Sequence, residues 1–219
     1  MFLGDFGVYW ECSWGLETDR HTDMHDVTVI GLVGEGGSGK DTVAGYLERR
    51  YGVVSLRFSD PIKELLRLFF DQPSREDQSW VGSTFRERFG KDIFIRAVDR
   101  RIRAAGRGIF SINGIRYEED ASFVRSFAKH AIIYVTADQR LRWERSQQRG
   151  EKSDDTMDFE TFRRLESTLE TEKDIGEMGK RADYSIRNEG TPDELFASVD
   201  RIMKKVSGDE RNDVERRQE

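Results

Sequence analysis

The first segment that could do chemistry is rich in glycine and ends in a lysine. Residues 34–40 read GEGGSGK, which matches the G-x-x-x-x-G-K pattern of a phosphate-binding loop. A strand-like run, VTVIGLV, precedes the loop, and an amphipathic segment, KDTVAGYLERR, follows it. Glycine lets backbone N–H groups turn toward phosphate oxygens, while a helix N-terminus and a lysine add positive charge. We therefore predict a nucleotide site formed by Gly34, Gly36, Gly37, Ser38, Gly39 and Lys40.

The position after the lysine departs from the commonest form of this loop. Asp41 stands where a serine or threonine hydroxyl usually ligates Mg²⁺, and Thr42 comes next. A carboxylate can hold the ion directly or through water, which leaves Thr42 to bond the α-phosphate. We predict ATP and Mg²⁺ as cofactors, with nucleotide binding that depends steeply on Mg²⁺. The alternative is that Asp41 is only a first-turn acid favoured by the helix dipole.

A second charged feature is the segment QRLRWERSQQRG. Its Arg142, Arg145 and Arg149 are spaced i, i+3 and i+7, so a helix would present them on one face. Each guanidinium can give two hydrogen bonds to a phosphate, and phosphoryl transfer is catalysed mainly by positioning and charge neutralisation. We predict that the three arginines are catalytic together with Lys40 and lie on a lid over about 139–157. The alternative is a solvated face whose charge nearby acids relieve.

The elements that must position these residues alternate between two kinds. Short, apolar, β-branched runs are separated by longer charged segments with helical periodicity, which is typical of βα units and a parallel sheet. The expected strands are Val27–Val33, Val53–Arg57, Ile109–Ile112, Ala131–Val135 and Tyr184–Ile186. The expected helices are Lys40–Arg50, Ile62–Phe70, Arg75–Phe89, Ile93–Ala104, Glu118–Lys129, Gln139–Gln148, Phe159–Thr171 and Pro192–Val206. The predicted fold class is α/β, a three-layer P-loop NTPase fold with a five-stranded parallel sheet flanked by helices and a small helical lid.

The composition of the chain limits the binding partners that can be expected. The chain has 219 residues with 36 basic and 42 acidic side chains, a formal charge of −6, so binding of a nucleic acid polymer by bulk charge is not expected. No apolar run approaches the roughly 20 residues of a membrane helix. A single cysteine excludes an internal disulfide and fits a reducing compartment. We expect a cytoplasmic monomer or homodimer that binds a small-molecule nucleotide and no membrane. Residues 1–23 are expected to be an N-terminal extension, either a disordered tail or an ordered accessory segment, with 24–206 the main domain and 207–219 a charged tail.

The motifs resemble a known group of kinases. GxxGSGKDTVAGYL followed by FSDPIKELL resembles the deoxynucleoside monophosphate kinases of bacteria and phages, which belong to the adenylate-kinase-like branch of P-loop kinases. Later segments, from SREDQSWVGSTFRERFGKD to ADYSIRNEGT, are also similar to archaeal nucleotide-kinase-like proteins and dephospho-CoA kinase. The resemblance covers about 26–205. It implies a five-stranded parallel sheet, ATP–Mg²⁺ as donor, a mobile lid and a phosphorylated small molecule as acceptor.

The resemblance also implies residues for the acceptor. Asp60 would accept a hydrogen bond or proton from the attacking group, Phe58 would stack on the base, and Arg86 would grip the phosphate. Arg116 stands just past the carboxyl end of the third expected strand, where ligands bind in open α/β sheets. The alternatives are an Asp60 that only caps the helix beginning at Pro61, and arginines that are ordinary surface charges.

Two further positions take their roles from the resemblance. Related kinases usually carry aspartate where Asn113 stands. Asparagine can still bond a metal-bound water but cannot act as a base. After the last strand, Asn188 and Gly190 would contact the adenine ring through backbone groups. The alternative there is a turn in which Thr191 caps the final helix.

The predicted function is transfer of the γ-phosphoryl group of ATP to a nucleoside or deoxynucleoside monophosphate. One alternative is a dephospho-CoA kinase, which Asn113 disfavours because an alcohol acceptor has more need of a base. A second alternative is a catalytically weak nucleotide-binding regulatory module, to which Asn113 and Asp41 both point.

Overall fold

A five-stranded parallel sheet organises the computed structural model, which describes residues 26–149, 157–168 and 170–207. The strand order is β2-β3-β1-β4-β5, so the strand that enters the phosphate-binding loop is central. The strands are β1 (Val27–Val33), β2 (Val54–Arg57), β3 (Gly108–Asn113), β4 (Lys129–Thr136) and β5 (Tyr184–Arg187). The central strand is almost wholly buried and apolar, as expected for a strand covered by helices on both faces.

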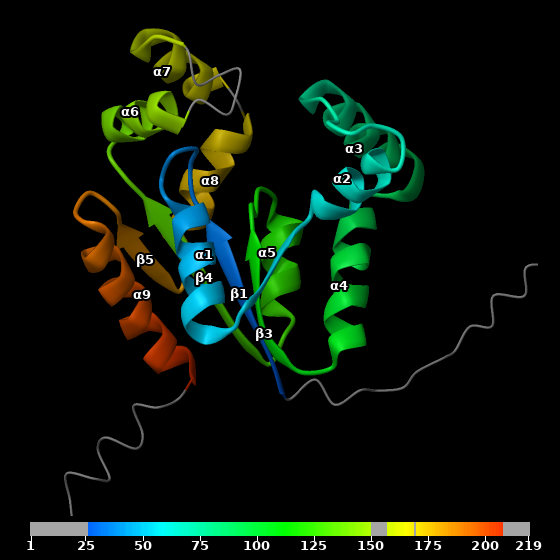
Figure 1. The fold of residues 1–219 in the computed structure, drawn as a ribbon, viewed down its shortest axis with the longest axis horizontal. Coiled ribbons are helices and arrows are strands. Elements are labelled where there is room, and N and C mark those ends of the chain that lie inside the picture. The colour runs from blue at the N-terminus through cyan, green and yellow to red at the C-terminus, as the bar shows by residue number, and fades with distance from the viewer. Residues whose placement is uncertain (1–25, 150–156, 169, 208–219) are drawn as a thin grey trace, which may run out of the picture.

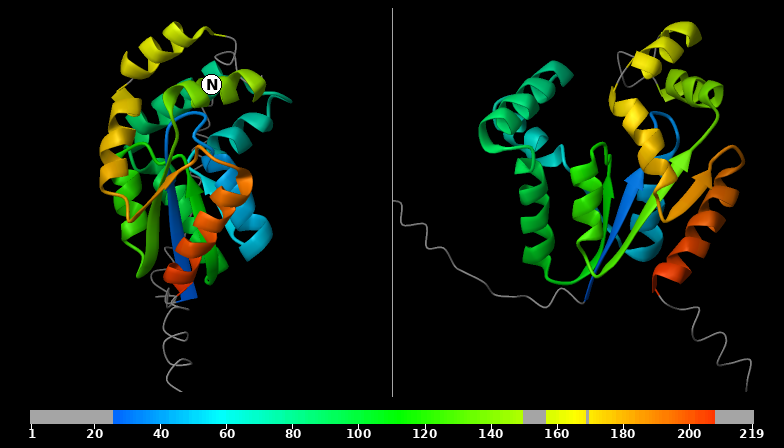
Figure 2. Two further views of the ribbon diagram at one scale, coloured as in Figure 1. Left: turned by 90° about the vertical axis from the view of Figure 1, so that its left-hand side faces the viewer. Right: turned by 180° about the vertical axis from the view of Figure 1, so that it is seen from behind.

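Helices cover both faces of this sheet and also rise above it (Figure 1). They are α1 (Lys40–Tyr51), α2 (Asp60–Arg67), α3 (Arg75–Phe89), α4 (Ile93–Ala105), α5 (Glu118–Arg125), α6 (Gln139–Arg149), α7 (Phe159–Thr168), α8 (Glu170–Lys180) and α9 (Pro192–Ser207). Alternate residues of β1 point to opposite faces of the sheet. Ile30 and Leu32 pack with α1 and α9, whereas Val27 and Val29 pack on the face covered by α4, α5 and α8. Figure 2 shows the sheet between these two layers.

Two groups of helices extend beyond the carboxyl ends of the strands. One group contains α2 and α3, and the other contains α6 and α7, with the loop after β1 between them (Figures 1 and 2). Parallel strands place all their carboxyl ends at one edge, where ligands bind in such sheets. This arrangement gives the loop a group of helices on each side.

The predicted fold class is confirmed: five parallel strands form one sheet with helices on both faces. The structure differs from the expected elements in several bounds and in one additional helix. Helix α8 was not predicted, α5 ends at Arg125 because β4 already begins at Lys129, and α2 covers Asp60–Arg67 instead of Ile62–Phe70. The expectations for 1–23, for the lid part 150–156 and for 208–219 lie outside the described residues. Among the helices that the structure describes, none is long and apolar enough to cross a membrane.

Candidate active site

The loop between β1 and α1 needs glycine for steric reasons. Gly37 and Gly39 have φ values of 77° and 99°, in the region that side chains rarely adopt. A Cβ atom on Gly37 would lie 2.5 Å from the backbone oxygen of Arg142, and one on Gly39 would lie 2.2 Å from Asn188 Nδ2. The loop is therefore packed between the start of α6 and the segment after β5.

Side chains from three parts of the chain bond the carbonyl oxygens of this loop. Lys40 Nζ donates to the Glu35 oxygen at 3.0 Å, Arg142 Nη1 to the Gly36 oxygen at 3.3 Å, and Asn188 Nδ2 to the Ser38 oxygen at 2.9 Å. The Ser38 side chain is fully buried, and its hydroxyl has no partner among the described residues. Ser38 would therefore face a ligand through its backbone rather than its hydroxyl.

Asp41 joins three elements at the edge of the sheet. Its Oδ1 accepts a hydrogen bond from Asn113 Nδ2 at the end of β3 and from Arg57 Nη2 at the end of β2, each at 2.7 Å. Asn113 is buried, and its Oδ1 has no partner in the described part of the chain. A carboxylate next to an amide oxygen that lacks a donor is an oxygen set that suits Mg²⁺ and its water ligands. Thr42 is exposed in the next position of α1.

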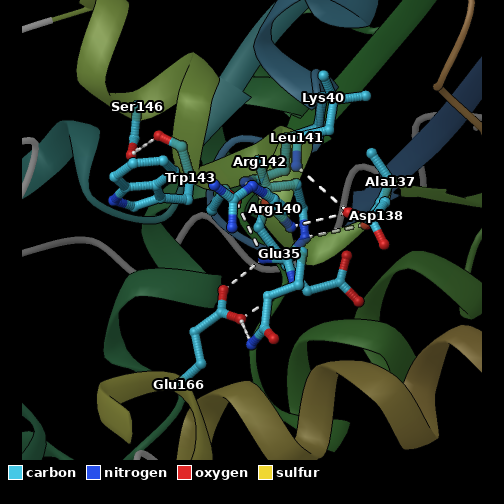
Figure 3. Close-up of polar contacts among 12 residues, drawn as sticks. Glu35, Lys40, Ala137, Asp138, Arg140, Leu141, Arg142, Trp143, Ser146 and Glu166 are labelled. Atoms are coloured by element: carbon cyan, nitrogen blue, oxygen red, sulfur yellow. Dashed lines mark hydrogen bonds and ion pairs between the residues drawn. The ribbon is translucent and has the colours of Figure 1, made fainter. Parts of the chain in front are cut away.

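The expected common face of three arginines is only partly seen. Arg142 is buried, and both of its terminal nitrogens contact the Glu166 carboxylate of α7, with Nη2 to Oε2 at 3.0 Å (Figure 3). Its Nε also donates to the Ala137 oxygen at 3.1 Å. Such a buried, bidentate pair fixes the guanidinium geometrically. Arg142 thus connects α6 and α7 to the phosphate-binding loop instead of pointing into open space.

Arg145 differs from Arg142 because one of its guanidinium nitrogens makes no hydrogen bond to the described residues. Its Nη1 is buried without a hydrogen-bond partner among the described residues. Burial lowers the pKa of the Arg145 guanidinium, and the negative charge of Glu189 counteracts this in part. A buried donor without a partner is rare and costs free energy, which an anion at this place would offset. The side chain of Arg149 lies outside the described residues.

Two cavities lie between the loop and the helices α3 and α4. The first has a volume of about 230 Å³, and Lys40, Asp41, Arg57, Asn113 and Arg116 are among its lining residues. The second, of about 420 Å³, is lined by Phe94, Ile95 and Lys91 among others. Both cavities share four lining residues, which are Phe58, Arg86, Tyr117 and Asp120. The first cavity is rich in cations and the second contains aromatic rings.

Arg86 occupies the boundary between the two cavities. Its guanidinium carbon lies 4.9 Å from the ring centre of Phe94 and 5.9 Å from that of Tyr117. No hydrogen bond or ion pair of this guanidinium is seen within the described residues. Cation–π contacts hold an arginine in place without using its N–H donors. Arg86 is therefore an oriented cation with donors available to an anion, whereas Arg88 of the same helix is exposed.

Asp120 fixes the backbone turn that enters the first cavity. Its Oδ2 accepts from the backbone N–H groups of Arg116, at 3.0 Å, and Tyr117, at 3.2 Å. Burial raises the pKa of the Asp120 carboxyl, while these two hydrogen bonds and the charge of Arg86 counteract the rise. The carboxylate thus anchors two residues whose side chains line the cavities.

The predicted residues of the FSDP segment have different surroundings. Phe58 is buried and lines both cavities. Its ring packs edge-to-face on Phe123, with 6.3 Å between the two ring centres. Asp60 is not among the residues that line these two cavities. Its Oδ2 accepts from the backbone N–H of Arg57 at 2.7 Å. The predicted cap needs correction as well, because Ser59 is the N-cap of α2 and Asp60 is its first residue.

Of the two roles that the sequence left open for the segment after β5, the structure shows the cap, and contact with adenine stays a prediction. Asn188 is buried against the loop, and Asn188 and Gly190 help to line a cavity of about 500 Å³ beside α9. Thr191 also caps α9, since its Oγ1 accepts from the Glu194 N–H at 3.3 Å while Glu194 Oε2 accepts from the Thr191 N–H at 2.8 Å.

Sequence reasoning missed several residues of this site. Arg57, Tyr117 and Asp120 line the first cavity, and Glu166 pairs with Arg142. Arg57 could have been found, because it ends an expected strand at the edge where ligands bind. Glu166 carries no such signal, since it lies 24 residues from its partner and in a different helix.

The comparisons with known proteins agree with this architecture. No model of a known protein family matches the sequence. A UPF0200 protein of Hyperthermus butylicus is 26% identical over 180 residues, which are 82% of this chain and 95% of that protein. A UPF0200 protein of Pyrobaculum aerophilum is 29% identical over 179 residues, 81% of this chain and 97% of its own length. A protein of Acanthamoeba polyphaga mimivirus with the provisional name deoxynucleotide monophosphate kinase is 25% identical over 140 residues, 48% of this chain and 72% of that protein.

Solved structures define the fold. Shikimate kinase from Bacteroides thetaiotaomicron superimposes with a TM-score of 0.54 at 16% identity, covering 82% of this chain and 98% of the kinase. Shikimate kinase from Acinetobacter baumannii, in complex with shikimate, gives a TM-score of 0.50 at 16% identity, with 86% and 98% covered. The chain thus has the fold of the P-loop small-molecule kinases. Within that class, its relatives of similar length are UPF0200 proteins, a name that states no substrate.

The loop geometry makes a first prediction about stability. Gly39→Ala should destabilise the protein by about 1–2 kcal/mol, the cost of a side chain in the left-handed region, with further loss from the contact with Asn188. Gly36→Ala is the matched control, because its Cβ would meet no described atom within 4 Å, and it should change stability by less than about 0.5 kcal/mol. Urea denaturation followed by tryptophan fluorescence measures both. Equal effects would contradict the described loop.

The ion pair between α6 and α7 makes a second prediction. Glu166→Ala leaves the Arg142 guanidinium buried without its carboxylate, which should cost about 3 kcal/mol of folding free energy. Glu160→Ala removes an exposed partner of Arg163 on the same helix and should have little effect. Denaturation curves give the free energy of unfolding of the two variants. A Glu166 variant as stable as the Glu160 variant would show that the buried pair is not formed.

Proposed function

We propose that this protein transfers the γ-phosphoryl group of ATP to the phosphate of a nucleoside or deoxynucleoside monophosphate. The observation that carries the proposal is the pair of adjoining cavities beside the phosphate-binding loop, which share four lining residues. The cavity that reaches Lys40 is lined by Arg57, Arg86 and Arg116, which suits a phosphate group. The adjoining cavity is lined by Phe58, Phe94 and Tyr117, which suits an aromatic base.

On the donor side, each predicted residue has a role in the proposal. Lys40 and the amides of the glycine-rich loop hold the β- and γ-phosphates, and the residues around Asn188 and Gly190 lie near the adenine. Asp41 and, through water, Asn113 would hold the magnesium ion, and Thr42 would lie near the α-phosphate. The ion would neutralise phosphate charge. Arg145 and Arg149 screen the group in transfer, and Arg142 positions the loop for it through the Gly36 oxygen.

On the acceptor side, the chain positions a nucleophile that needs no strong base. A phosphate oxygen of the acceptor attacks the γ-phosphorus, the bond to the β-phosphate oxygen breaks, and ADP leaves. Arg86 and Arg116 hold the acceptor phosphate, and Phe58 packs on the base. Asp60 acts through the backbone of Arg57, which it fixes. Positioning and charge neutralisation supply most of the catalysis in such reactions, so the neutral side chain at Asn113 is compatible with turnover.

A substrate panel tests the proposed reaction. ADP release from ATP–Mg²⁺ is measured with each ribo- and deoxynucleoside monophosphate and with dephospho-CoA. The proposal expects rapid turnover with at least one monophosphate and dependence on Mg²⁺. Turnover with dephospho-CoA alone would replace the proposed acceptor. Tight ATP binding without stimulation by any acceptor would instead indicate a regulatory nucleotide-binding module.

Arg86 gives a sharper test of the acceptor site. Arg86→Ala removes the oriented guanidinium, so the KM for the acceptor should rise about 10- to 100-fold, as expected for lost hydrogen bonds to a charged group. The KM for ATP should change little. Arg88→Ala, an exposed arginine two residues further along α3, is the control and should leave both constants as they are. The assignment is refuted if the two variants behave alike.

A further inference from the structure

Arg57 makes an ion pair that joins the two halves of the site. Its backbone ends β2, and its side chain lines the cation-rich cavity together with Lys40, Arg86 and Arg116. Its Nη2 contacts Asp41 Oδ1 at 2.7 Å, and Asp41 follows the lysine of the phosphate-binding loop. One contact thus connects the donor side of the cleft to the acceptor side.

We propose that Arg57 is a ligand of the acceptor phosphate and that Asp41 holds its guanidinium in the cleft until the acceptor binds. This inference rests on the proposed function and adds a residue to it.

The ion pair is weak enough to exchange. The side chains of Arg57 and Asp41 are 44% and 55% exposed, and ion pairs with this exposure contribute little to stability. The same oxygen of Asp41 also accepts a hydrogen bond from Asn113. This bond keeps the Asp41 carboxylate in place when Arg57 leaves. A phosphate with two negative charges can take two parallel hydrogen bonds from a guanidinium, which makes it the stronger partner.

The backbone of Arg57 is already fixed for this role. Asp60 Oδ2 accepts from the Arg57 N–H at 2.7 Å, and Arg57 pairs with Asn113 in the register of β2 and β3. Only the side chain therefore has to move between Asp41 and the cavity. Because the backbone of Arg57 is already fixed, less entropy is lost when its side chain binds a ligand.

Asp41 also makes the two substrates dependent on each other. In the proposed function this carboxylate faces the magnesium ion of the donor, so the ion and the Arg57 guanidinium compete for one group. Donor binding would release Arg57 to the acceptor phosphate. We expect the acceptor to bind more tightly when Mg²⁺ and a non-hydrolysable ATP analogue are present.

Calorimetry on the full chain tests the inference. The probes are dAMP, dGMP, dCMP and dTMP, each with and without Mg²⁺ and β,γ-imido-ATP. For the probe that the wild type binds most tightly, Arg57→Gln should weaken binding about 10- to 100-fold and abolish the gain from the donor analogue. Arg57→Lys keeps the positive charge but loses the forked geometry of the guanidinium. Its affinity for the probe should therefore fall between that of the wild type and that of Arg57→Gln. Arg101→Gln, which removes an exposed partner of Glu64, is the control and should bind like the wild type.

The Asp41→Asn background separates the two possible roles of Arg57. If Arg57 grips the acceptor, the loss caused by Arg57→Gln persists when Asp41 is already neutral. If Arg57 only neutralises Asp41, the loss disappears in the double variant, and the inference is overturned. Binding unaffected by Arg57→Gln overturns it too while leaving the proposed function in place. A wild type that binds none of the four probes, and turns over no monophosphate, overturns both.

Discussion

The site depends on the way the carbonyl groups of one loop are held from outside. The oxygens of Glu35, Gly36 and Ser38 accept hydrogen bonds from Lys40, Arg142 and Asn188. These donors come from the start of α1, from α6 and from the segment after β5. Because the loop carbonyls are bonded by these side chains, the positive-φ glycines can turn backbone N–H groups toward a phosphate. The fold brings the three donors together by placing β1 between β3 and β4 and by adding β5 beside β4.

Charge is the second constraint, and it is local. The chain as a whole carries a formal charge of −6, yet one cavity concentrates Lys40, Arg57, Arg86 and Arg116. Arg86 rests on two aromatic rings, and Arg57 shares an exposed ion pair with Asp41. Arg142 is the contrast, because Glu166 neutralises it and it serves to hold the loop. The role of each arginine thus depends on the group that it contacts rather than on its position on a helix.

Much of the fold could be predicted from the sequence because the relevant signals are local. The buried strand, the glycine-rich loop and the amphipathic helix that follows it are contiguous between Val27 and Tyr51, and the structure has them where they were expected. Helix α8 was missed because its sequence, ETEKDIGEMGK, has two glycines and only two buried apolar side chains, Ile175 and Met178. One of those glycines, Gly179, is explained by its neighbour, since a Cβ atom would lie 2.7 Å from the Tyr134 ring.

The site residues that escaped prediction depend on contacts between distant segments. Glu166 looks in sequence like the exposed charges around it, and only the packing of α6 on α7 distinguishes it. Asp120 likewise resembles its neighbours Glu118 and Glu119 until the fold buries it against the turn at Arg116. Periodicity reports which face of a helix is apolar, but it does not report which charged residue will find a partner.

The central claim is that a single cationic cleft takes the phosphates of donor and acceptor together. Calorimetry with nucleotides in which adenosine is joined to a second nucleoside through five phosphates tests it most directly, because such a molecule spans both halves of the cleft. The account predicts binding at a ratio of one to one, tighter than that of ATP, and competition with both ATP and a nucleoside monophosphate. Competition with ATP alone, or affinity no greater than that of ATP, would contradict it.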